Sequence, residues 1–174
     1  NIPELTIITP AALQTEAERV AQLHREEGLT VAVIEQEKIF NEFSSGTPDA
    51  SAYRRLMKMF YDRAEGNENV RPRYLLLFGD GSYNNRKSME KLHSPECNML
   101  LTYQSKTSID ERESFVIEDY FGFLENNSGE EIKVDKVCLG IGRFPISSIK
   151  NARLVVDKLY RYVHDKDFSS WKNN

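Results

Sequence analysis

The sequence predicts a three-layer α/β fold, in which a mainly parallel sheet of about four strands lies between layers of helices. Short runs rich in apolar and β-branched residues, typical of strands buried on both faces, alternate along the chain with longer segments of helical periodicity. Glycine, proline and polar turn residues separate these segments. Because parallel strands need a long crossover between them, this alternation predicts parallel pairing with helices on both faces.

The strands are expected where apolar residues follow one another without a polar face. The clearest is 74–78, a tyrosine, three leucines and a phenylalanine that end abruptly at Gly79. Residues 99–104 are expected to form a strand or extended segment, and 115–124 extended segments around a turn. The other expected strands are 5–8, 29–34 and 137–141.

Helical spacing of apolar residues predicts three firm helices and one short helix or turn, which are 11–27, 49–64, 149–164 and the short segment 35–43. Thr9 and Pro10 suit the start of the first helix, because threonine caps helices and proline fits their first turn. Gly28 is expected to end it. Three helices cover about four buried strands only sparingly, so we expect one side or edge of the sheet to stay partly bare and apolar.

The composition argues against two classes of protein. The formal net charge is −4 over 174 residues, with basic residues scattered among acids, so no nucleic-acid partner is expected. No apolar run approaches the roughly 20 residues of a membrane-spanning helix. The chain has no initial Met and no signal peptide, so we expect a piece cut from a longer protein, with no targeting signal to read.

Asp80 and Ser82 directly follow the strongest predicted strand, between and after two glycines. Ligands of open α/β sheets gather beyond the carboxyl ends of the strands, so Asp80 is a candidate site-lining acid or metal ligand, with Ser82 beside it. The alternative is a turn aspartate whose carboxylate binds its own backbone.

Glu118 and Asp119 are adjacent acids before two aromatic residues and a glycine. Carboxylates of this kind suit a hard cation such as calcium. Neighbours in a strand point to opposite faces, however, so both can bind one ion only if the backbone bends. A solvated acidic turn is the alternative.

Arg143 follows a glycine-rich segment at the end of the last predicted strand. The segment lacks the third glycine of the dinucleotide fingerprint, so a phosphate loop is not indicated. Because carboxyl ends of parallel strands share an edge, Arg143, Asp80 and Asp119 are expected near one another, with Arg143 pairing with one of the two acids. A structural ion pair is the simpler interpretation.

The cysteines and histidines do not form a convincing catalytic or zinc site. His93 lies four residues before Cys97, but the intervening Ser94-Pro95 disfavours the helix that would bring the pair together. Cys138 is expected to be a small buried residue inside the last strand. His24 and His164 are expected on exposed helix positions. No catalytic residue is assigned.

Four segments in a fixed order resemble the gingipain-like cysteine peptidases. They are LLLFGDGSY at 75–83, EDYFG at 118–122, LGIGRFPIS at 139–147 and the helical segment NARLVVDKL at 151–159. The resemblance covers residues 5–171, nearly the whole chain. Within the family, the first and third segments are closest to the signal peptidase, or sortase, of the type IX secretion system.

The resemblance implies a caspase-like fold in two similar subdomains, of which residues 1–174 are the first and non-catalytic one. The catalytic His and Cys of the family lie in the second subdomain. The parent enzyme would cleave C-terminal secretion signals of type IX cargo at the outward face of the outer membrane. Its partners would be the second subdomain, those protein substrates and other secretion components. Family members also bind calcium, but no ligand is assigned here and no other cofactor is expected.

Two other functions remain open from the sequence. One is a non-catalytic binding or scaffolding α/β domain of a secretion or cell-surface protein. The other is a small-ligand domain that uses residues 79–82. A His and a Cys at successive strand ends further along the parent chain would favour the enzyme.

Overall fold

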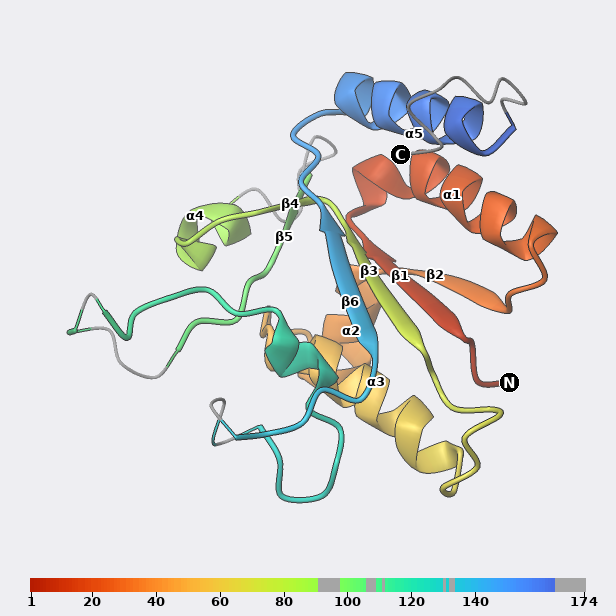
Figure 1. The fold of residues 1–174 in the computed structure, drawn as a ribbon. Coiled ribbons are helices and arrows are strands. Elements are labelled where there is room, and N and C mark those ends of the chain that lie inside the picture. Colours follow the sequence, from red (N-terminus) through yellow and green to blue (C-terminus); the bar gives the residue numbers. More distant parts are fainter. Residues whose placement is uncertain (91–97, 106–108, 111, 130, 132–133, 165–174) are drawn as a thin grey trace.

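The computed structural model describes residues 1–174 except 91–97, 106–108, 111, 130, 132–133 and 165–174. It confirms the predicted α/β class: a four-stranded parallel sheet lies between helices (Figure 1). The strand order is β2-β1-β3-β6. These strands are β1 (Leu5–Thr9), β2 (Val31–Glu35), β3 (Tyr74–Phe78) and β6 (Gly140–Phe144).

A second, two-stranded parallel sheet stands at the carboxyl edge of the main one. It pairs β4 (Asp80–Gly81), which directly follows β3, with β5 (Met99–Leu100). The short helix α4 (Asn85–Glu90) lies beside it (Figure 1). After β3 the chain therefore enters this second, smaller sheet directly, through β4.

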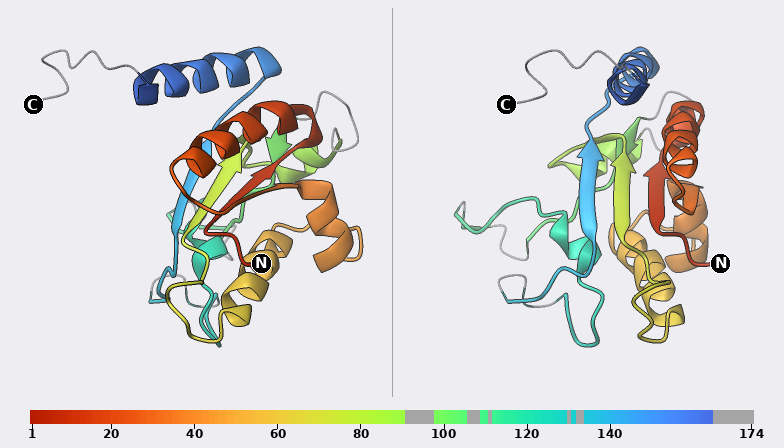
Figure 2. Two further views of the ribbon diagram at one scale, coloured as in Figure 1. Left: turned by 90° about the vertical axis from the view of Figure 1, so that its right-hand side faces the viewer. Right: turned by 45° about the vertical axis from the view of Figure 1, so that its right-hand side comes forward.

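Helices cover both faces of the main sheet, as Figure 2 shows from two sides. One face carries α1 (Gln14–Glu26), preceded by the turn η1 (Ala11–Leu13), and α5 (Ile149–His164), which packs on α1. The other face carries α2, α3 and a 3₁₀ turn, with the bounds Gln36–Phe43, Ser51–Arg63 and, for this turn (η2), Asp119–Gly122.

Tyr53 of α3 is the centre of the core on the second face. It is fully buried and its ring lies 5.7 Å from that of Phe40 and 5.5 Å from that of Phe121. Burying a large side chain of this kind contributes about 1.5–3 kcal/mol. Its hydroxyl donates to Gln36 and accepts the Leu101 amide, at 2.8 and 3.3 Å. This core therefore anchors the chain that follows β5.

The last strand differs from the prediction. Residues 137–139 precede the sheet, and the strand is Gly140–Phe144. Glycines usually weaken a strand, but here the pairing with β3 determines which residues form it. Gly140 pairs with Tyr74, and Phe144 pairs with Phe78. The prediction that Cys138 lies inside the sheet is therefore wrong; it is a half-buried free thiol before β6.

Two smaller expectations are also corrected. Thr9 ends β1 and does not begin the first helix. Its hydroxyl donates to the Pro10 carbonyl and so caps no helix amide, and Pro10 is the residue that precedes η1. The expected extended turn at 115–124 contains the compact η2.

In the described part of the chain, no helix combines the length and apolar character that crossing a membrane requires.

Candidate functional site at the carboxyl edge of the sheet

Arg143 is the centre of the carboxyl edge. It lies next to last in β6, opposite Leu77 of β3, so its side chain reaches the point where the main sheet ends. Its guanidinium forms an ion pair with Glu118. It also donates to the carbonyls of Gly79 and Asp80, each at 3.2 Å, and of Leu101 at 3.3 Å.

This cluster ties together segments far apart in the sequence. Arg143 contacts the end of β3, the chain after β5 and the residue before η2. Only 11% of its side chain is exposed, against 26% for Glu118. Carbonyl and carboxylate acceptors around a largely buried guanidinium satisfy its donors, which makes the edge rigid.

Gly81 is required by this packing. A Cβ atom there would lie 2.9 Å from the Thr102 methyl and 3.2 Å from the Arg143 guanidinium carbon. Contacts that short force neighbours apart. The glycine after Asp80 therefore lets Arg143 lie against the backbone.

Asp80 is at this edge, but its carboxylate binds its own turn. It accepts the Gly81 amide at 2.8 Å, while the Asp80 amide approaches the carbonyls of Asn98 and Ile146. Ser82 behaves in the same way: its hydroxyl accepts the Asn84 amide at 3.1 Å. Both side chains therefore shape the turn that follows β3.

The expected pairing of Arg143 with Asp80 or Asp119 is wrong. Glu118 is the carboxylate partner, and Asp80 meets Arg143 only through its main-chain oxygen. Asp119 is exposed on η2 and belongs to none of the contacts that hold Arg143. The adjacent acids thus separate, one facing the cluster and one facing solvent. Among the described residues, no group of three or more His, Cys, Asp or Glu side chains is arranged to hold a metal ion.

Aromatic residues fix η2 and hence Glu118. The rings of Tyr103 and Tyr120 stack with centroids 3.4 Å apart, and Arg54 of α3 lies over Tyr120 at 5.4 Å. Burial raises the pKa of the Tyr120 hydroxyl above its ordinary value, and the Arg54 charge opposes this shift. Arg54 also donates to the Phe123 carbonyl at 2.7 Å, which holds the chain after η2.

Neither Arg54 nor the carbonyl of Leu101 was predicted from the sequence to belong to this site. A cation near the start of the amphipathic helix 51–63 was the only available signal for Arg54. A backbone carbonyl carries no sequence signal, so the Leu101 contact could be found only from the structure.

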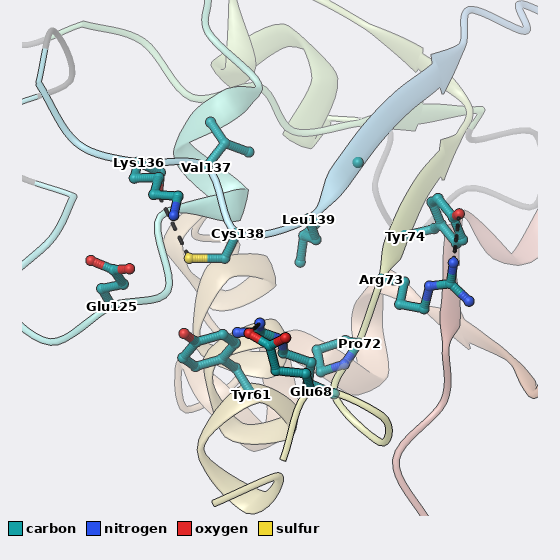
Figure 3. Close-up of a pocket in the computed structure, with 12 residues that line it drawn as sticks. Tyr61, Glu68, Pro72, Arg73, Tyr74, Glu125, Lys136, Val137, Cys138 and Leu139 are labelled. Atoms are coloured by element: carbon teal, nitrogen blue, oxygen red, sulfur yellow. Dashed lines mark hydrogen bonds and ion pairs between the residues drawn. The ribbon is translucent and has the colours of Figure 1, made fainter. Parts of the chain in front are cut away.

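A cleft at the opposite, amino edge contains Cys138 (Figure 3). Its volume is about 500 Å³, and Tyr61, Lys136 and Glu125 line it together with Cys138. The only contact described for the sulfur is a weak one, 3.7 Å to the Lys136 carbonyl.

No described contact joins Cys138 to a histidine. His24 bonds to Glu27 and His164 stacks on Tyr160. The predicted but disfavoured pair of His93 and Cys97 lies outside the described residues. An activated catalytic thiol needs a base within hydrogen-bond reach, and no contact described for Cys138 supplies one.

Comparison with known proteins supports the sequence resemblance. The profile of the family described as Peptidase family C25 matches residues 1–174. Among solved structures, the chain is similar to dimeric latent PorU from Porphyromonas gingivalis, with 42% sequence identity and a TM-score of 0.85. The alignment covers 100% of this chain and 17% of that chain. No curated protein sequence matches.

Proposed function

Because the chain belongs to peptidase family C25, we propose that it forms the first, structural subdomain of a gingipain-like cysteine peptidase. The observation that carries this proposal is the extent of the match. The whole chain aligns with only 17% of a PorU chain, so the relative has most of its length elsewhere. The catalytic Cys and His are proposed to lie in that remaining length.

The arrangement of the carboxyl edge fits a supporting role. Catalytic groups of α/β sheets gather beyond the carboxyl ends of the strands, and this edge is held by one buried arginine. We propose that the edge forms one wall of the substrate cleft, with the catalytic subdomain opposite. Glu118 and Arg143 would hold the wall in shape, Asp80 and Ser82 its turn, and Asp119 would face solvent or substrate.

The substrate is proposed from the relationship to PorU. The parent enzyme would cleave C-terminal secretion signals from type IX cargo and act at the cell surface, on the outward face of the outer membrane. Its partners would be its own catalytic subdomain, cargo proteins with such signals and other secretion components.

A second candidate is a non-catalytic binding or scaffolding domain. The engagement of Asp80 and Ser82 with their own turn favours it, because each side chain already accepts a backbone amide that shapes this turn. This candidate requires that the longer protein has no working Cys–His pair.

The test is cleavage of a cargo C-terminal segment by the purified longer protein and, separately, by the 174-residue chain. We expect cleavage only by the longer protein, blocked by a thiol-alkylating reagent and absent with a scrambled segment. Cleavage that survives alkylation would contradict a cysteine mechanism. No cleavage by either protein would favour the scaffold.

A further inference from the structure

The main sheet is covered unevenly on the face of α1 and α5. α1 packs on β1 and β2, and α5 packs mainly on α1 and η1 (Figures 1 and 2). The neighbouring half of this face, formed by β3 and β6, carries a groove of about 630 Å³. Its lining is mostly apolar and includes Leu76, Phe144 and Leu159.

Glycines form part of the groove floor. A Cβ atom on Gly142 would meet nothing within 4 Å. At Gly140 a Cβ would meet the Tyr74 ring at 3.2 Å, and Tyr74 itself is 41% exposed. A strand with glycines facing an open groove lets another backbone or a large side chain approach closely.

α5 extends this apolar surface. Ala152 and Val156 are buried on the face turned toward α1. Other apolar residues of the same helix are exposed, by 58% for Leu154, 37% for Val155, 60% for Tyr162 and 41% for Val163. Leu159 lies between these pairs in sequence and lines the groove. On the helix surface Val155 and Tyr162 neighbour Leu159, four residues before it and three after it, so the apolar face of α5 is wider than the part buried against α1.

We propose that this groove is the docking site of one amphipathic α-helix supplied by the remaining length of the same protein. The inference rests on the proposed function, in which residues 1–174 are part of a longer peptidase. Each strand occupies about 4.8 Å of sheet width, so two strands present a surface roughly 10 Å wide, close to the spacing of packed helices. The helix would place a large apolar side chain over Gly142 and pack its flank on the exposed apolar residues of α5 beside Leu159.

The test compares how fast a cysteine at position 142 is labelled in the shorter chain and in the longer protein. Gly142→Cys is introduced into the 174-residue chain and into the longer natural protein, both carrying Cys138→Ala. Maleimide labelling of the position-142 peptide is followed by mass spectrometry. Glu42→Cys, on the exposed side of α2 across the sheet, is the control that reacts equally in both.

We expect labelling at position 142 to be at least about tenfold slower in the longer protein, because reaction then requires local opening. Equal, fast labelling in both proteins would overturn the proposal. Protection within the 174-residue chain would also overturn it: the occupant would be a second copy if protection grew with concentration, and a segment of these residues if it did not.

A second substitution guards against misfolding of the cysteine variant. Gly142→Leu fills open space in the 174-residue chain and should leave its melting temperature unchanged or higher. In the longer protein it should lower the melting temperature by about 4 °C or more, since the helix is pushed away. Equal effects in both would refute docking. Cargo cleavage by the longer protein, measured alongside, separates failure of the docking site from failure of the proposed function.

Discussion

Replacing Arg143 by Met should remove the cluster that holds the carboxyl edge while keeping the length of the side chain. The guanidinium contacts three carbonyls and one carboxylate, and its side chain is 11% exposed. Breaking a buried ion pair by removing one partner costs about 3–5 kcal/mol. The Glu118 side chain is 26% exposed, so in the variant water hydrates its carboxylate in part. We therefore expect the free energy of unfolding to fall by about 2–4 kcal/mol.

A loss of that size is a large part of the roughly 5–15 kcal/mol stability of an ordinary domain. Urea unfolding of the 174-residue chain measures it as a lower midpoint at unchanged slope. Arg143→Lys keeps the charge but loses the planar guanidinium. It should therefore lower the free energy of unfolding measurably, but by less than Arg143→Met does.

Arg55→Met is the matched control. Arg55 also pairs with an acid, Asp49 at 3.4 Å, but its side chain is 51% exposed. Its removal should cost less than about 1 kcal/mol. If Arg143→Met costs no more than Arg55→Met, Arg143 does not hold the edge together and the reasoning from burial is refuted.

Three further outcomes are expected. Gly81→Ala should lower stability by about 1–3 kcal/mol, because its Cβ meets the Thr102 methyl, whereas Gly142→Ala should not; equal effects in chemical unfolding would contradict this packing. Cys138 should react with a thiol reagent in the native protein, at a rate well above that of global unfolding, and protection until unfolding would place it back in the sheet. Burial raises the pKa of Tyr120 above the unfolded value of about 10, so this contribution to stability is complete below pH 10 and is lost as pH rises through the folded pKa. Tyr120→Phe should remove that alkaline loss in unfolding curves measured between about pH 9 and 11, and an unchanged pH profile would argue against the burial.

The strongest local patterns predicted the fold well. The strand 74–78 and the helix 149–164 appear with the predicted bounds, as Tyr74–Phe78 and Ile149–His164. An uninterrupted apolar run and a long helical period each have few alternatives. The last strand was misplaced because its valine and leucine positions look more strand-like than Gly140–Phe144, and only pairing with β3 selects the glycine-rich segment.

The candidate site was predicted only in part. Parallel strands put Arg143 and the backbone of Asp80 at one edge, which follows from topology alone. The choice of Glu118 as partner depends on how η2 packs through Phe121 and Tyr120 against α3. That packing involves contacts between segments far apart in the sequence, so periodicity and spacing could not supply it.

We propose that these residues support a cysteine peptidase whose nucleophile lies elsewhere in the protein. A cysteine-directed activity probe, applied to the longer protein and to the 174-residue chain, tests it when the labelled residue is identified by mass spectrometry. We predict stoichiometric labelling of one cysteine outside residues 1–174 and none in the shorter chain. Labelling at Cys97 or Cys138, or no labelling of either protein, would contradict the account.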